Sequence, residues 1–179
     1  MALLQVAVVI GIIAANPTPR PGQIGAIYLD GPGESQVWID LVPRSDELGP
    51  SLVHINFTLT FPGRQLTQMP ATVTVRARTE CFAYPTTIRQ PILRFVLDGS
   101  RVISPTTPDA RLRFVASGCS EGADTIVAQI PFSVLVEISD ARDIRVDALG
   151  FTLHFTRENR GSVEQFAKLI RGGVAIGNP

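Results

Sequence analysis

Residues 52–61 read LVHINFTLTF, and apolar and polar side chains alternate along them from Val53 onward. Successive side chains of a β-strand point to opposite faces, so this alternation predicts a strand with one face in a hydrophobic core and the other in water. The predicted core face consists of Val53, Ile55, Phe57, Leu59 and Phe61, and the predicted wet face of His54, Asn56, Thr58 and Thr60. We therefore expect residues 52–61 to form the central strand of a sheet.

Shorter runs of β-forming residues lie on both sides of this strand, and turns containing glycine or proline separate them. Two dipeptides, Asp98-Gly99 and Leu149-Gly150, predict tight hairpins. Strands joined by such short turns pair in the antiparallel sense. The predicted strands are residues 24–29, 36–42, 71–77, 92–97, 101–103, 110–116, 124–130, 144–148 and 151–155.

A short helix is predicted near 131–141. Phe132, Leu135 and Ile138 have helical spacing, and Pro131 is well placed at the first turn of a helix. The same residues also fit a strand, but the proline and the nearby Ser133 favour the helix.

A longer C-terminal helix is predicted near 162–171. Ser162 and Gln165 match a capping box, in which a side chain at the helix start and one three residues later satisfy free backbone N–H groups. The apolar stripe of this helix is Val163, Phe166, Ala167 and Ile170. Together, these elements predict a mainly β fold: an antiparallel β-sandwich with a short helix near 131–141 and a C-terminal helix near 162–171.

Composition indicates one folded domain. Hydrophobic residues make up 45% of the 179 residues and charged residues 18%, which excludes a disordered chain. The formal net charge is zero, so no overall field attracts nucleic acid or an anionic membrane. We expect residues 24–179 to form a single β-sandwich domain.

The N-terminal segment predicts export. Residues 1–15 carry no charge, and a 15-residue helix spans only about 22 Å, less than the roughly 30 Å of a bilayer core. This length suits a signal peptide better than a membrane span, although the usual basic residue near the start is missing. Residues 16–23 then form a proline-rich spacer, and the protein is expected in the periplasm or outside the cell. The alternative is a buried first strand at residues 3–13, which would favour the cytoplasm.

Cys81 and Cys119 are the only cysteines. In an exported protein, an even number of cysteines predicts a disulfide, and each of the two lies near the end of a predicted strand. The alternative is two separate small buried thiols. Neither cysteine belongs to a cluster with metal-ligand spacing, so no metal or other cofactor is expected.

Candidate ligand-binding residues are basic or aromatic. Arg76, Arg78, Arg94, Arg111 and Arg113 all alternate with apolar residues, so they would form one basic stripe if their strands were neighbours. Such a stripe suits a polyanionic glycan, whereas arginines paired with acidic residues would be an ordinary solvated face.

Trp38 and the two histidines complete the candidates. Trp38, the only tryptophan, is expected to be buried in the sandwich, with a ligand-stacking platform as the alternative. His54 and His154 are both expected on exposed strand faces.

The C-terminal part resembles the tails of small exported β-sandwich proteins of the bacterial envelope whose function is uncharacterised. The resemblance rests on Ile130-Pro131-Phe132, on Leu135, Ile138 and Ala141, on the hairpin 144–155 and on the closing helix. It implies an envelope location but no activity and no site residues.

The sequence contains no phosphate loop, nucleophile elbow, zinc-protease motif or dinucleotide fingerprint. We therefore expect a non-enzymatic exported module that binds a ligand or has a structural role. Its partner would be another envelope protein or a polyanionic glycan, without nucleic acid and without an integral membrane span. The alternatives are a hydrolase that acts on an extracellular polymer through loop carboxylates, and a subunit of a cell-envelope assembly.

Overall fold

The computed structural model describes residues 11–13, 19–45, 53–79, 92–105 and 125–177. Its larger sheet has five antiparallel strands, in the spatial order β2 (Ile24–Leu29), β3 (Glu34–Leu41), β5 (Val53–Pro62), β6 (Thr72–Thr79) and β9 (Thr125–Pro131). Its smaller sheet, also antiparallel, has the order β4 (Arg44–Ser45), β11 (Phe151–His154), β10 (Ile144–Ala148), β7 (Leu93–Leu97) and β8 (Arg101–Ile103). The predicted strand 110–116 lies outside the described residues.

The alternating stretch forms β5, the middle strand of the larger sheet, as predicted. In register, Phe57 lies between Ile39 of β3 and Val75 of β6, and all three side chains are fully buried. The intervening residues of β5 point to the other face of the sheet. A single strand therefore contributes to both the core and the opposite, polar face.

The smaller sheet is built around two tight hairpins. Asp98 and Gly99, with φ values of 49° and 71°, open the three-residue loop 98–100 that joins β7 to β8. Leu149 and Gly150, with φ values of 56° and 83°, form the two-residue loop that joins β10 to β11. Two successive residues with positive φ give the turn whose twist suits a two-residue hairpin. Leucine rarely adopts this conformation, but Leu149 is fully buried, and that burial holds the turn in place.

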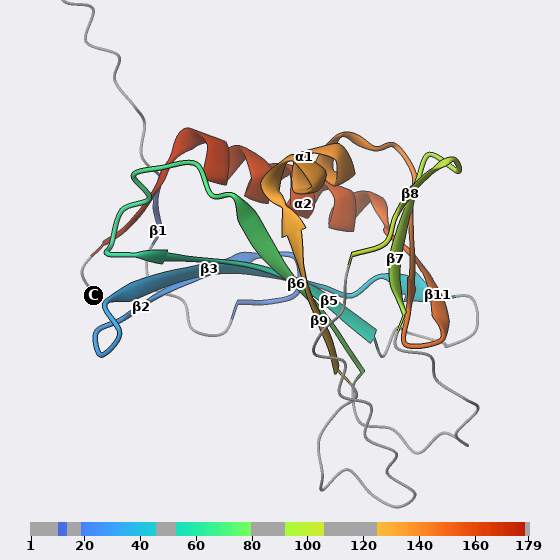
Figure 1. The fold of residues 1–179 in the computed structure, drawn as a ribbon, viewed down its shortest axis with the longest axis horizontal. Helices are drawn as coiled ribbons and strands as arrows, with labels where there is room; N and C mark the ends of the chain where they lie inside the picture. Colours follow the sequence, from blue (N-terminus) through green and yellow to red (C-terminus); the bar gives the residue numbers. More distant parts are fainter. Residues whose placement is uncertain (1–10, 14–18, 46–52, 80–91, 106–124, 178–179) are drawn as a thin grey trace, which may run out of the picture.

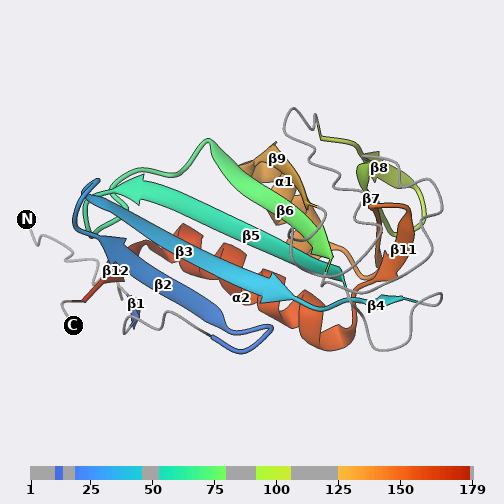
Figure 2. The ribbon, with the colours of Figure 1, turned by 90° about the horizontal axis from the view of Figure 1, so that it is seen from below.

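Helices α1 (Phe132–Asp140) and α2 (Arg157–Gly172) lie together over one face of the larger sheet, and the smaller sheet stands beside them (Figure 1). The same arrangement seen from below shows the other face of the larger sheet uncovered by helices (Figure 2). One continuous core connects both sheets and both helices. At the junction, the rings of Phe57 and Phe95 lie 6.2 Å apart, centroid to centroid. The predicted fold class, mainly β with two antiparallel sheets and two helices, is confirmed.

The short helix is confirmed as α1, which follows Pro131. The predicted start of the C-terminal helix is wrong, because α2 begins at Arg157 and not at Ser162. Thr156 is the N-cap and forms a reciprocal capping box with Asn159, which satisfies the first free N–H groups six residues earlier than a cap at Ser162 would. Ser162 lies inside the helix, where its hydroxyl donates to the Glu158 carbonyl. The predicted apolar stripe of the helix is buried as expected.

Two further short strands, β1 (Gly11–Ile13) and β12 (Val174–Ile176), pair in parallel. β1 lies within the segment expected to be a signal peptide, so this pairing joins that segment to the C-terminal part of the chain. Neither β12 nor β4 was predicted, because strands of two or three residues are too short to show a period.

Candidate functional site

The candidate site is the outer face of the larger sheet, which we define as the face turned away from the helices (Figure 1). Inward residues of its strands are buried, and outward residues are mostly polar. Strand register aligns Trp38 with Thr58 and Thr74, and Asp40 with Asn56 and Arg76. Ile27 and Val127 also lie on this face, beside Gln36 and Arg76. Its other outward residues include Gln36, Trp38, Asp40, His54, Asn56, Thr58, Thr60, Thr74, Arg76, Arg78 and Gln129.

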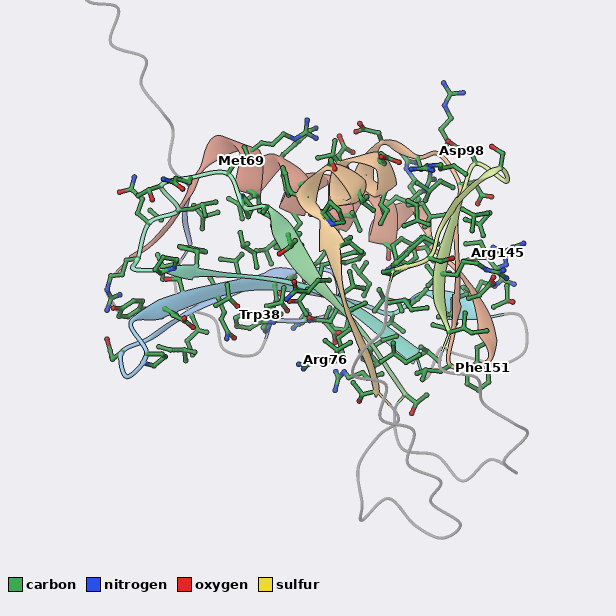
Figure 3. All side chains as sticks on the ribbon, in the orientation of Figure 1. Trp38, Met69, Arg76, Asp98, Arg145 and Phe151 are labelled. Carbon is green, nitrogen blue, oxygen red and sulfur yellow. The ribbon has the colours of Figure 1, made fainter. Side chains whose placement is uncertain are left out.

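Trp38 lies on this outer face and not in the core, so the expectation of a buried sandwich tryptophan is wrong. Figure 3 shows its side chain below the larger sheet, opposite the helices. The indole lies across the backbone of Gly25, so closely that a Cβ added at this glycine would be 2.5 Å from Cε2 of Trp38. Pro19 borders the same glycine at 2.8 Å. Glycine at position 25 therefore lets the ring rest on the sheet, partly buried beneath and partly open to solvent.

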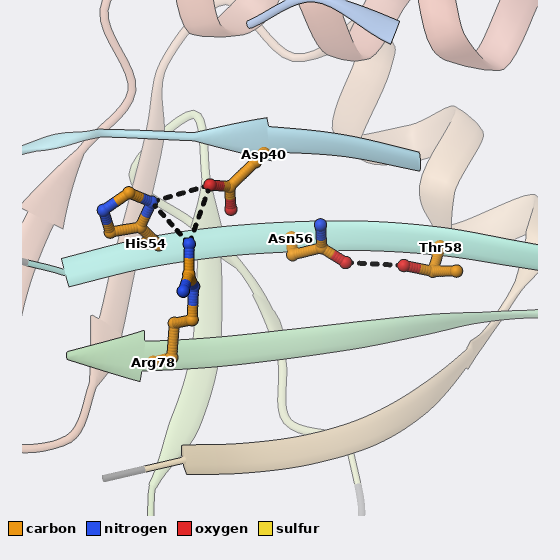
Figure 4. Close-up of polar contacts among 5 residues, drawn as sticks. All are labelled: Asp40, His54, Asn56, Thr58 and Arg78. Carbon is orange, nitrogen blue, oxygen red and sulfur yellow. Dashed lines mark hydrogen bonds and ion pairs between the residues drawn. The ribbon is translucent and has the colours of Figure 1, made fainter. Parts of the chain in front are cut away.

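Asp40, His54 and Arg78 form a cluster that joins β3, β5 and β6 (Figure 4). The Nδ1–H of His54 donates to Oδ2 of Asp40 at 2.7 Å, and a guanidinium nitrogen of Arg78 donates to the same oxygen at 3.2 Å. His54 is only 6% exposed, which corrects the expectation of an exposed strand histidine. The reason is that Asp40, on the neighbouring strand, accepts its hydrogen bond and holds the ring against the sheet.

Two opposing effects set the charge state of Asp40. Burial raises the pKa of its carboxyl. The hydrogen bond and charge of His54, together with those of Arg78, lower the pKa by more than burial raises it. The pKa therefore lies below its ordinary value of 3.8, and Asp40 is a carboxylate near neutral pH. Oδ1 of Asp40 is buried without a hydrogen-bond partner, so all its bonding within the described residues passes through Oδ2.

Neutral hydrogen-bonding groups lie between this cluster and Trp38. The hydroxyl of Thr58 donates to the amide oxygen of Asn56 at 2.5 Å, which orients the Asn56 side chain (Figure 4). Both residues are half-buried. They present a hydroxyl and an amide beside the indole, on the strand next to Trp38.

The condition for a single arginine stripe, that the strands be neighbours, is not met by Arg94. Arg76 and Arg78 share β6 on the outer face of the larger sheet, whereas Arg94 belongs to β7, and the chain passes from the larger to the smaller sheet between these two strands. Arg94 pairs with Asp147, with its Nε 2.9 Å from Oδ2. Arg111 and Arg113 lie outside the described residues.

Arg76 differs from the other arginines of the two sheets that were predicted to bind a ligand. Its side chain is exposed, and it makes no ion pair with any residue that the structure describes. In Figure 3 it lies on the same side of the sheet as Trp38. The outer face thus combines an aromatic ring, neutral hydrogen-bonding groups and one unneutralised guanidinium.

Cys81 and Cys119, predicted to form a disulfide, lie outside the described residues. Across the described part of the chain, no three metal-binding side chains come together. No helix in that part is both long and apolar enough to cross a bilayer.

No protein-family model, curated protein or solved structure matches this chain. Fold and site together define a mainly β protein with an open sheet face that carries aromatic, amide, hydroxyl and guanidinium groups.

Proposed function

We propose that this chain is a non-enzymatic binding module, exported to the periplasm or secreted, which binds a carboxylated glycan on the outer face of its larger sheet. The observation that carries the proposal is Trp38, held across Gly25 with part of its ring open to solvent. An aromatic ring in this position offers an apolar surface for the C–H face of a sugar.

The groups around Trp38 suit the rest of a sugar. Asn56, Thr58 and Thr60 lie on the adjacent strand, and their amide and hydroxyl groups both donate and accept hydrogen bonds. A few such polar groups beside an apolar surface fix the orientation of a bound ligand. Neutral groups of this kind match sugar hydroxyls.

Arg76 provides the preference for a carboxylated sugar. Its β6 strand is two positions away from the β3 strand of Trp38, and strand spacing places the two residues roughly 12 Å apart along the face. That separation requires a ligand longer than one sugar ring. A guanidinium binds a carboxylate through two parallel hydrogen bonds, and Arg76 has no protein carboxylate to compete for it among the described residues.

The Asp40–His54–Arg78 cluster supports a binding role. Its three side chains bond to one another, so the cluster fixes the positions of β3, β5 and β6 beneath the proposed ligand. We assign it a positioning role for the outer face.

Binding is tested with alginate, a polymer of carboxylated sugars, and with dextran as the neutral control. Affinity electrophoresis of the full chain should show retardation by alginate and none by dextran. Trp38→Ala and Arg76→Ala should each weaken alginate affinity at least roughly tenfold, because anchoring tryptophan and arginine side chains each typically contribute more than about 1.4 kcal/mol.

Matched variants keep this test specific. Arg171→Ala removes an exposed cation at the end of α2 and should leave binding unchanged, whereas Trp38→Phe should retain part of it. If Arg171→Ala weakens alginate binding as much as Arg76→Ala does, the protein binds alginate only through general charge attraction, which would contradict the proposed site. Shortening of the alginate chains during incubation would contradict the non-enzymatic part of the proposal and favour the hydrolase.

Export and a Cys81–Cys119 disulfide belong to the same proposal, supported by the uncharged apolar segment 1–15 and the even cysteine count. Expression with the native N-terminus in a bacterial host should yield an intact mass that lacks residues 1–15. Both thiols should become alkylated only after reduction. A full-length mass with two freely alkylated thiols would contradict export, and β1 would then be a permanent strand paired with β12.

A further inference from the structure

A second group of basic side chains lies on the outer face of the smaller sheet, which we define as the face turned away from the shared core. Register aligns Arg44 of β4 with His154 of β11, and His154 with Arg145 of β10. Residues at such directly opposite positions lie on the same face, with Cβ atoms about 5 Å apart. Three adjacent strands therefore bring three basic side chains into one row.

This row is only partly neutralised. Asp147 is the only carboxylate at an outward strand position in the described part of this sheet, and it already bonds to Arg94. Its other oxygen lies 3.4 Å from Nε of Arg145 and accepts a hydrogen bond from Thr152 at 3.3 Å. Arg44 is exposed and makes no ion pair among the described residues. Three guanidinium groups facing one carboxylate leave a local excess of positive charge.

A depression of about 490 Å³ lies at one end of this row. Arg94 and Arg145 line it together with Asp147, and Ile92 and Phe151 contribute an apolar wall. Figure 3 shows Arg145 on the side of the smaller sheet that faces away from the helices, and Phe151 at the end where β10 turns into β11. Nε of Arg145 is buried and makes no hydrogen bond, because its ion pair with Asp147 is too long and too poorly aligned to be one.

We infer that this depression binds a phosphate monoester with an apolar body, at a site separate from the proposed glycan face. Arg145 and Arg94 bind the phosphate oxygens, because guanidinium groups pair with phosphate through parallel hydrogen bonds. The doubly charged phosphate matches the excess of two positive charges that Arg44, Arg94, Arg145 and Asp147 give the described part of this face. Arg44 adds to the attraction along the row, and Phe151 with Ile92 packs against the apolar body.

Phenyl phosphate is the probe, since it joins a phosphate to an aromatic ring, and isothermal titration calorimetry on the full chain is the measurement. One molar equivalent should bind, and inorganic phosphate should bind more weakly because it lacks the apolar part. Arg145→Ala should lower the affinity at least roughly tenfold, the effect expected of an anchoring arginine. Arg171→Ala, distant in the fold, should leave the affinity unchanged.

Two further measurements are made: one identifies the source of the phosphate, and the other replaces Arg145→Ala if that variant does not fold. Co-sedimentation with phosphatidic acid vesicles, lost in Arg145→Ala, would make the natural ligand a lipid headgroup, whereas phenyl phosphate binding alone would make it a soluble ester. Arg44→Ala alters an exposed side chain outside the depression and should weaken binding about threefold through the loss of nearby charge. The Arg44→Ala variant therefore tests the site if Arg145→Ala does not fold.

The inference is overturned if neither probe binds, or if Arg145→Ala and Arg171→Ala bind phenyl phosphate as the wild type does. Its outcome is distinguishable from that of the glycan proposal. Arg145→Ala should leave alginate retardation unchanged, and Trp38→Ala should leave phenyl phosphate binding unchanged.

Discussion

Phe57→Ala is expected to lower the free energy of unfolding by about 4 kcal/mol, because removing a fully buried phenyl ring loses its transfer free energy and leaves a cavity. Phe57 lies in the middle strand of the larger sheet, and its ring is 6.2 Å from that of Phe95 in the smaller sheet. The substitution therefore weakens the contact between sheets as well as the core beneath the helices. Urea unfolding followed by circular dichroism measures the loss.

Met69→Ala is the matched control, since Met69 is 56% exposed and its truncation should change stability by less than about 0.5 kcal/mol. Both proteins should unfold in a single transition because the two sheets share one core. Two separate transitions, or a loss below about 1 kcal/mol for Phe57→Ala, would show that the sheets are stabilised independently.

Asp40→Asn is expected to lower the free energy of unfolding by about 2 kcal/mol near pH 7, because Oδ2 accepts charge-assisted hydrogen bonds from both His54 and Arg78. The amide of asparagine carries no charge and cannot neutralise these two partners. The effect should appear as a shift of the urea midpoint without a change in its slope.

The difference between wild type and Asp40→Asn should depend on pH. The folded-state pKa of Asp40 is lowered, so its stabilising contribution is fully present above the unfolded-state pKa of about 3.9 and is lost as the pH falls through the folded-state pKa. In strong acid the protonated aspartic acid resembles asparagine, and the two proteins should converge. Asp30→Asn is the control, because Asp30 is 88% exposed and contributes little through its contact with Arg64. A difference that stays constant down to about pH 2 would exclude the carboxylate as its cause.

The strands and hairpins were largely predictable from local pattern. The alternation through 52–61 reflects the two faces of β5, and Asp98-Gly99 and Leu149-Gly150 occupy positive-φ positions that tight hairpins require. The α2 start was missed because Thr156 caps the helix through Asn159, a weaker capping-box signal than the glutamine after Ser162. Local patterns therefore predicted the existence and type of the strands and helices better than the residues at which they begin and end.

The candidate site was less predictable, because it depends on which strands become neighbours. Arg78 and Arg94 look alike in sequence, but β6 and β7 belong to different sheets, so no common stripe forms. His54 is bonded to Asp40 on the adjacent strand, and Gly25 on β2 makes room for the Trp38 ring on the outer face. Each of these contacts joins two neighbouring strands, and local sequence patterns do not predict which strands pair or in which register.

Fluorescence titration of the wild-type chain tests the proposed glycan face most directly, because Trp38 is the only tryptophan and reports on that face alone. Addition of alginate oligosaccharides should shift its emission to shorter wavelength and saturate, as a sugar ring displaces water from the indole, and dextran should have no effect. An emission spectrum that does not change over concentrations at which alginate binds would place the glycan elsewhere on the protein and contradict the proposed binding face.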